Sequence, residues 1–229
     1  MGNQAGALVE VAVGDEADAW RSIGFAVAEG GTCLVGRVGI RFTGQAGDPE
    51  GGIAGWTLAG LPIEGGDVDG LATTTGRPTG DVVGADTATG AATRLHPNGV
   101  VQLDHLVILT PDLDRTTGAF EAIGLEARRT REAGRGRLQR FFRLGEVILE
   151  VVGPVEPSGD GPARFWGFAF TVVDIDATAA HLGERVGRPK PAVQPGRRIA
   201  TLRSQPGVSV PVAFMSGAEA TGPSDDARL

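Results

Sequence analysis

The sequence of 229 residues has a single cysteine, no tyrosine and only 5% aromatic residues. With Cys33 as its only cysteine the chain cannot form an internal disulfide, which favours a reducing compartment. No apolar run reaches about 18 residues, and no basic segment followed by an apolar one opens the sequence. We therefore expect a cytoplasmic protein without a membrane partner.

Positive charge is also scarce, because 21 Lys and Arg face 28 Asp and Glu and the net charge is −7. A nucleic-acid partner is not expected, since phosphate contacts need clustered cations. The arginine-rich stretch 128–137 is the exception, and we interpret it as the solvated edge of a β-hairpin rather than as a phosphate site. The 37 glycines indicate many turns, while 41% hydrophobic residues allow a substantial core.

A pattern of one strand, one helix and three further strands occurs twice. Its most visible mark is a pair of aspartates after the first strand: Asp112 and Asp114 in one copy, Asp174 and Asp176 62 residues later in the other. Such an internal duplication can enclose a pocket that neither copy closes alone. The expected strands are 103–109, 127–132, 138–144 and 147–152, then 165–172, 190–193, 198–203 and 208–214, with helices over 113–123 and 175–186.

A fainter copy opens the chain, with a strand over 7–13, a helix over 17–23 that ends at Gly24, and strands over 32–35 and 38–42. Residues 52–60 look like the first strand of a fourth copy, and no further strands are expected after them. The segment that follows is rich in Gly, Thr and Asp and lacks periodicity. The expected organisation is a degenerate module over 1–60, a loop over 61–98, a domain of two modules over 99–216, and a disordered tail over 217–229.

The two clear copies resemble the vicinal-oxygen-chelate superfamily, which includes the glyoxalases. The resemblance rests on the segments 103–107 (LDHLV), 111–114 (PDLD) and 145–152 (GEVILEVV). It implies an α+β fold in which two βαβββ modules form a curved, half-open mixed β-barrel. Helices would cover the convex face, and the concave face would hold a metal ion and a ligand.

The resemblance also implies which residues hold the metal. His105 on the first strand and Glu150 on the fourth would bind one divalent ion (Zn, Ni, Fe, Mn or Co), and Glu150 would transfer a proton as the catalytic residue. Gly167 and Val212 occupy the matching positions of the second copy and offer no donor. Metal binding is therefore expected to be weak or absent, with His96 as the only candidate for a third ligand.

Other interpretations of these residues stay open. His105 and Glu150 could equally form a buried hydrogen-bonded pair without a metal. Because side chains alternate along a strand, Asp104 is expected on the face opposite His105. In the opening copy, Arg41 aligns with Glu150.

Four residues are expected to contact the ligand. Gln139 and Phe141 alternate on the third strand of the first copy, and we predict that their face looks into the cleft. Trp166 lies beside a glycine of the partner strand, and Arg198 could neutralise a ligand carboxylate, although an exposed strand end is the simpler reading of that arginine.

Three functions fit these patterns. The first is a glyoxalase-like lyase, isomerase or dioxygenase that uses a divalent metal and an incomplete ligand set on a small oxygenated substrate. The second is a metal-free protein that binds or sequesters a small molecule, as antibiotic-resistance members of the superfamily do. The third is a scaffold that forms a homodimer.

Overall fold

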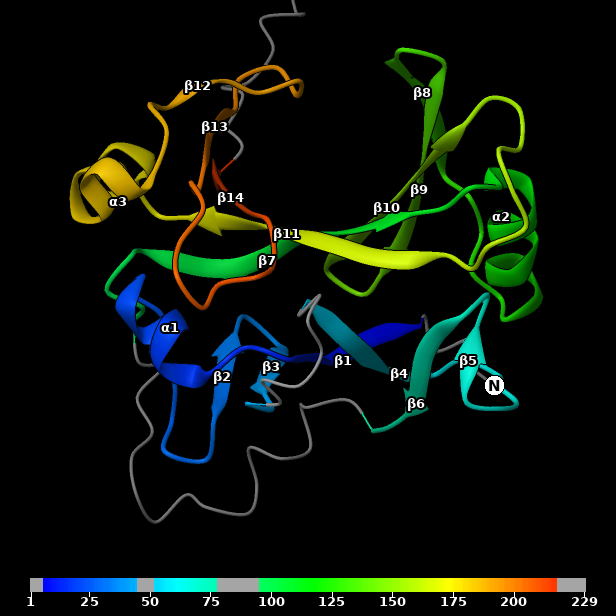
Figure 1. Cartoon of the computed structure of the whole chain (residues 1–229), viewed down its shortest axis with the longest axis horizontal. Helices are drawn as coiled ribbons and strands as arrows, with labels where there is room; N and C mark the ends of the chain where they lie inside the picture. The colour runs from blue at the N-terminus through cyan, green and yellow to red at the C-terminus, as the bar shows by residue number, and fades with distance from the viewer. Residues whose placement is uncertain (1–5, 45–51, 78–94, 218–229) are drawn as a thin grey trace, which may run out of the picture.

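The computed structural model describes residues 6–44, 52–77 and 95–217, which form two β-sheets and their covering helices (Figure 1). The N-terminal elements are β1 (Ala7–Val13), α1 (Ala17–Ser22), β2 (Thr32–Val35), β3 (Val38–Phe42), β4 (Ile53–Ala59), β5 (Asp67–Val68) and β6 (Leu71–Thr75). The C-terminal elements are β7 (Val100–Leu109), α2 (Leu113–Ala122), β8 (Arg129–Gly134), β9 (Arg137–Leu144), β10 (Val147–Pro154), β11 (Arg164–Val172), α3 (Ile175–Leu182), a short 3-10 helix (Gly183–Arg185), β12 (Lys190–Pro191), β13 (Arg198–Thr201) and β14 (Val212–Ser216). None of the described helices has the length and apolar character to cross a membrane.

The C-terminal sheet has the strand order β12-β13-β14-β11-β7-β10-β9-β8. Its centre is the antiparallel pair β7 and β11, and each of these strands has the last strand of its own module as a parallel neighbour. The two modules therefore extend outward from the centre in the same order. This topology confirms the predicted α+β fold of two βαβββ modules in a curved, half-open barrel, with α2 and α3 outside the sheet (Figure 1).

The duplicated aspartates begin the two helices. The side chain of Asp112 accepts a hydrogen bond from the backbone N–H of Arg115 at 2.9 Å. Asp174 accepts from the N–H groups of Asp176 and Ala177 at 2.9 and 3.1 Å. Each carboxylate satisfies N–H groups that the first helical turn leaves without partners, so the repeated motif is a pair of N-caps.

The N-terminal sheet repeats the same topology in shorter form, with the order β2-β3-β1-β4-β6-β5. β1 pairs in parallel with β3 and antiparallel with β4, and β4 pairs in parallel with β6. The fourth copy therefore continues beyond its first strand as β5 and β6, without a helix. The prediction of a loop over all of 61–98 was wrong for these strands, because Thr-rich β6 has little apolar periodicity and is held by its pairing with β4.

Other predicted boundaries differ by a few residues. The second-copy helix ends at Leu182, where Gly183 has a φ of 58°, rather than continuing to Val186. Its last strand covers 212–216 rather than 208–214. Residues 78–94 of the predicted loop and 218–229 of the predicted tail lie outside the described residues.

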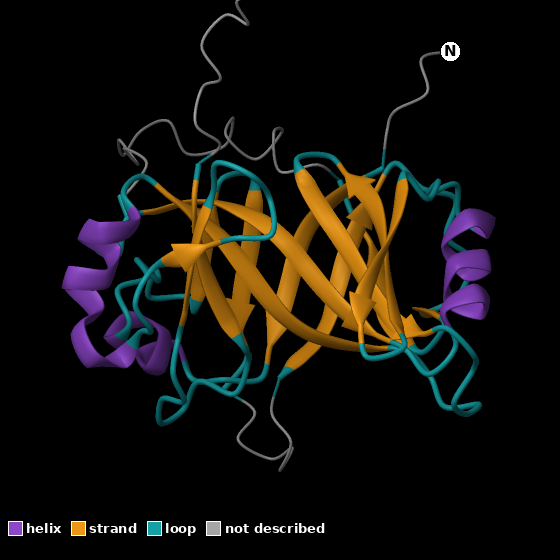
Figure 2. Ribbon diagram, turned by 90° about the horizontal axis from the view of Figure 1, so that it is seen from above, coloured by secondary structure: helices purple, strands orange, loops and turns teal. Residues whose placement is uncertain are grey.

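The two sheets pack back to back. Phe25, which follows α1, packs against Phe170 of β11 with ring centroids 5.1 Å apart, and Trp56 of β4 packs against Phe165 of β11 at 5.2 Å. Figure 1 shows the N-terminal strands beneath β7 and β11, and Figure 2 shows the helices at the two outer ends of the strands. The concave face of the eight-stranded sheet is left open.

Candidate functional site

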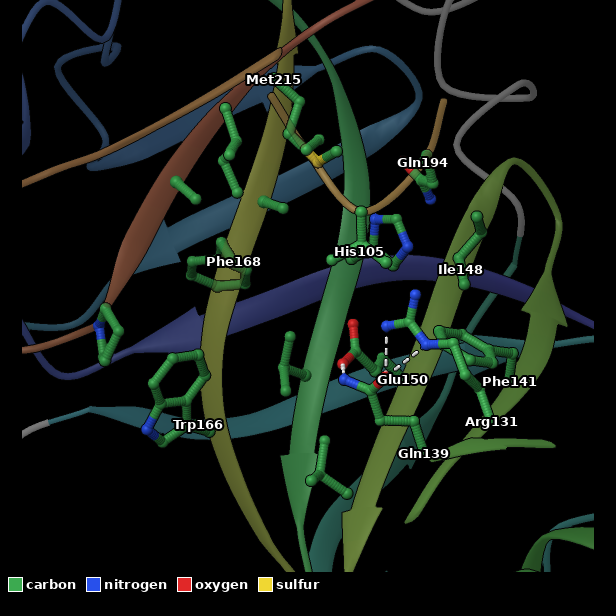
Figure 3. A pocket seen from close by; sticks show the side chains of 18 of the residues that line it. His105, Arg131, Gln139, Phe141, Ile148, Glu150, Trp166, Phe168, Gln194 and Met215 are labelled. Atoms are coloured by element: carbon green, nitrogen blue, oxygen red, sulfur yellow. Dashed lines mark hydrogen bonds between the residues drawn. The ribbon is translucent and has the colours of Figure 1, made fainter. Parts of the chain in front are cut away.

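A cleft of about 950 Å³ occupies the concave face of the eight-stranded sheet (Figure 3). One wall, from β11, β13, β14 and the turn before β13, is mainly apolar, and the opposite wall, from β8, the residue before it and β9, is rich in arginine. The apolar wall includes Trp166, Phe168, Val193, Ile199, Val212 and Met215; the arginine-rich wall includes Arg128, Arg129, Arg131 and Arg143.

Five of the residues singled out from the sequence line this cleft together. His105 from β7 and Glu150 from β10 lie on its floor, Gln139 and Phe141 belong to the β9 wall, and Trp166 lies on β11 with 44% of its surface exposed. Their proposed roles in metal, substrate or proton binding stay predictions. Their common location follows from the pairing of β7 with both β10 and β11.

His96 and Arg198 do not lie in the cleft, and both expectations need correction. The Nδ1 of His96 accepts a hydrogen bond from the N–H of Ala26 at 3.0 Å, and its Nε2 lies 3.1 Å from the carbonyl oxygen of Leu34. Both ring nitrogens thus bind the backbone of the N-terminal module, so His96 is not placed to be a third ligand. Arg198 instead forms an ion pair with Asp176 of α3 at 2.6 Å, outside the cleft.

Asp104 lies beside His105 rather than on the opposite face. Leu103 and His105 face Phe170 and Ala169, which are consecutive on β11, so Asp104 is an extra residue at a β-bulge. The bulge breaks the alternation of side chains, and the Oδ2 of Asp104 lies 3.1 Å from the Nδ1 of His105. Strict alternation predicted the wrong face, because a bulge cannot be read from apolar periodicity alone.

Arg197, from the turn before β13, completes this cluster. Its Nη1 lies 2.7 Å from the same Oδ2 of Asp104, and both side chains are largely buried. Burial alone would raise the pKa of Asp104, but hydrogen bonds and charge interactions with His105 and Arg197 hold that pKa below its ordinary value. The ionised carboxylate accepts from Nδ1–H, which leaves Nε2 of His105 as the nitrogen without a hydrogen-bond partner among the described residues.

Glu150 is held by a different chain of hydrogen bonds. The amide of Gln139 donates to the Oε1 of Glu150 at 2.5 Å, and the Nε of Arg131 donates to the Oε1 of Gln139 at 2.9 Å (Figure 3). Burial raises the pKa of Glu150, while the charges of His105 and Arg131 and the bond from Gln139 oppose this effect. A carboxyl group of this kind can exchange a proton closer to neutral pH than an exposed one.

The residues present do not fit a divalent metal centre. No group of three or more His, Cys, Asp or Glu side chains in the described part of the chain could hold an ion. At the matching position of the second module, a Cβ on Gly167 would lie 2.5 Å from the backbone oxygen of Pro211. No ligating side chain fits there, and buried Val212 offers none either. Two donors alone rarely bind such an ion tightly.

The same glycine occurs in the N-terminal copy for the same reason. Gly55 faces Ala12 on β1 as Gly167 faces Val107 on β7, and a Cβ on Gly55 would lie 2.9 Å from the oxygen of Ala72. The close backbone approach is therefore a feature of the fold.

The N-terminal copy carries a different pair where His105 and Glu150 lie. Its pairing of Ala12 with Arg41 matches that of Val107 with Glu150, which confirms the alignment expected from the sequence. Glu10 takes the position of His105, and its Oε1 lies 2.8 Å from the Nε of Arg41. In the N-terminal copy, the two positions that match His105 and Glu150 are therefore occupied by an ion pair.

Three residues of the site were not predicted from the sequence: Arg131, which lines the cleft, and Asp104 and Arg197, which bind behind His105. The signal for Asp104 was present, since an acidic residue next to a histidine inside an apolar strand needs a partner. Arg131 was assigned to a solvated hairpin edge, yet it reaches the cleft from the edge strand. Arg198 was predicted to contact the ligand, but its neighbour Arg197 is the one that reaches the site, where it binds Asp104. The sequence does not show which of two adjacent side chains points toward the site.

No protein-family model and no curated protein matches the chain. Among solved structures, a methylmalonyl-CoA epimerase from Mycobacterium tuberculosis is 18% identical, with a TM-score of 0.43 over 52% of this chain and 90% of that one. A Streptomyces coelicolor methylmalonyl-CoA epimerase in complex with 2-nitronate-propionyl-CoA is 23% identical, with a TM-score of 0.43 over 54% and 99%. A hypothetical protein from Bacillus halodurans is 18% identical, with a TM-score of 0.43 over 53% and 97%. By its own topology, the part of the chain from β7 to β14 has the paired βαβββ fold of the vicinal-oxygen-chelate superfamily.

Proposed function

We propose that the protein binds a small, partly apolar molecule in the cleft and does so without a divalent metal. The observation that carries this proposal is the cleft itself: about 950 Å³ between an apolar wall and a polar wall, with too few donors for a metal centre. Ligand sites of drug-sized molecules have volumes of about 300–1,000 Å³ and combine apolar lining with a few polar groups.

The polar groups on the floor would orient the ligand. The ring of His105 is fixed by Asp104, and the carboxyl group of Glu150 is fixed by Gln139. Groups that are already positioned lose little conformational entropy when a ligand arrives, which favours binding. The apolar wall would supply most of the binding free energy by removing ligand surface from water.

Calorimetric binding of three matched compounds tests the proposal: phenylbutyrate, its amide and phenylbutylamine, each with and without a chelator. Ala213→Phe would fill the cleft from β14, and Ala133→Phe adds the same bulk at an exposed position of β8 outside the cleft lining. We expect at least one compound to bind, with binding lost in the first variant only and unchanged by the chelator. Binding that survives Ala213→Phe, or that disappears with the chelator, would refute the proposal.

The floor of the cleft supports proton transfer as a second function. Nε2 of His105 could take a proton from a carbon next to a carbonyl group, with the electron pair moving to the carbonyl oxygen, and Glu150 in its neutral form could return a proton to carbon. The specific observation is that Asp104 fixes the ring of His105 on the same floor as a carboxyl group with a raised pKa.

Deuterium incorporation from D₂O into a bound carbonyl compound, followed by NMR, tests this second function. We expect exchange in the wild type and its loss in His105→Gln and Glu150→Gln. Asp104→Asn should reduce exchange less than His105→Gln, because it removes the orientation of the ring and not the base itself. Equal exchange in all four proteins would show that the floor is not catalytic.

A further inference from the structure

We infer that the cleft selects ligands with an anionic head group, such as a carboxylate, which binds to the arginine-rich wall while an apolar body lies against β11 and β14. This inference rests on the proposed small-molecule site and specifies its ligand class. The net charge of the chain, −7, would by itself favour a cationic ligand rather than an anionic one.

The charge of the cleft is the reverse of that of the whole protein. Four arginines line it, and Glu150 is the only acidic residue among its described lining residues. Low-dielectric walls strengthen the field of such a cluster at the ligand position, and complementary charge raises both affinity and association rate. An acidic protein gains nothing in solubility from cations collected inside a cleft, so a ligand is the more direct explanation.

Three of these arginines, Arg129, Arg131 and Arg143, share one face by the geometry of the strands. Arg129 and Arg131 lie two residues apart on β8, where side chains alternate. Arg143 lies on β9 opposite Ile148, which in turn lies opposite His105 on β7. A ligand anion bound to Arg143 would therefore be separated from the histidine on the floor by one intervening strand, β10.

The cleft arginines differ in their pairing from an arginine on the other face of the same sheet. Arg140 of β9 points away from the cleft and forms an ion pair with Asp114 at 2.7 Å and a hydrogen bond to Thr117 at 2.8 Å. Within the described part of the chain, the side chains of Arg129 and Arg143 have no such partner. Their donors are left to water or to a ligand.

Arg131 is held in place without being neutralised. Its guanidinium donates to Gln139 and lies 5.6 Å from the ring centre of Phe141. Gln139 stands between Arg131 and Glu150, so no direct ion pair is formed between the two charges in the described structure. A planar guanidinium fixed by an amide and a ring retains N–H groups for a carboxylate, which it can bind through two parallel hydrogen bonds.

The three matched phenylalkyl compounds separate this inference from the proposed function, because they share an apolar body and differ in head-group charge. We expect phenylbutyrate to bind about tenfold more tightly than its amide, with phenylbutylamine weakest, and the preference to shrink at high salt. Arg131→Gln and Arg143→Gln should each weaken phenylbutyrate binding about fivefold to tenfold and leave the amide unchanged. Arg137→Gln, an exposed arginine of β9 outside the cleft lining, is the matched control.

Different outcomes test the proposed binding function and the inference about ligand charge separately. If no compound binds in the cleft, the proposed function fails. If the amide or amine binds as tightly as phenylbutyrate, or if Arg137→Gln weakens binding as much as the two cleft variants, the inference about charge is overturned while the small-molecule site stands. Two separate cleft variants guard against loss of binding through misfolding, and their thermal unfolding should match that of the wild type.

Discussion

Gly167→Ala tests whether backbone packing, rather than loss of a metal ligand, explains the glycine beside the cleft. The new Cβ would lie 2.5 Å from the backbone oxygen of Pro211 and 3.1 Å from its Cβ. The oxygen belongs to the backbone and the Cβ to the rigid ring of a proline directly before β14, so neither can move aside as the end of a flexible side chain could. The strands must separate or a hydrogen bond must lengthen.

The expected magnitude combines two opposing effects. Overpacking of this kind costs about 1–3 kcal/mol, and reduced freedom of the unfolded chain returns about 0.4–1 kcal/mol. With mid-range values of about 2 and about 0.7 kcal/mol, the free energy of unfolding should fall by about 1.3 kcal/mol. This corresponds to a fall in Tm of about 3–5 °C for a chain of this size.

Urea unfolding followed by circular dichroism measures this change, with Gly118→Ala as the matched control. Gly118 lies in the middle of α2, and no atom lies within 4 Å of the Cβ that alanine would add. That substitution should raise the free energy of unfolding by about 0.5–1 kcal/mol, because alanine favours helix. Equal or higher stability of Gly167→Ala relative to the wild type would refute the argument from backbone approach.

Three further predictions concern buried polar groups. Burial lowers the pKa of His96 below 6.5, so at acidic pH the unfolded chain binds a proton at this residue more readily than the folded protein does. The free energy of unfolding measured with urea should therefore fall as the pH drops below about 6.5, and it should fall less in His96→Gln. Burial raises the pKa of Glu150, so its contribution to stability is present below about pH 4.5 and is lost as the pH rises above that value. Glu150→Gln should therefore gain stability relative to the wild type as the pH rises above about 4.5, and a difference that does not change with pH would contradict this. A double-mutant cycle of Asp104→Asn and Arg197→Gln should give a coupling free energy of about 1–3 kcal/mol, whereas additive effects would show that the ion pair contributes little.

The sequence predicted much of the local structure because the information is local. An aspartate before an apolar helix satisfies N–H groups of its first turn, so Asp112 and Asp174 indicated where two helices begin. The bounds predicted for β1, β2 and β3 from their apolar patterns agree with those observed. The repeated sequence pattern indicated the paired modules. β6 escaped prediction because its pairing with β4, and not its own composition, makes it a strand.

The candidate site could be predicted only in part. The resemblance to the vicinal-oxygen-chelate superfamily implied that His105 and Glu150 share one cleft, and the structure brings them to the same floor. The positions of His96 and Arg197 depended on the directions of side chains in turns, and that of Arg198 on the first residue of a strand, which no periodicity governs.

What the sequence determined by itself was the order of strands and helices within the two clear modules, the positions of their helix caps, and the scarcity of metal-binding side chains, since these depend on residue type and short spacing. Only the tertiary structure decided which charges meet. It placed Asp104 beside His105 through a bulge, inserted Gln139 between Arg131 and Glu150, and gathered arginines from one side of the sheet of an acidic protein into one wall. These arrangements depend on register between strands far apart in the chain, and a register shift of one residue turns a side chain to the opposite face.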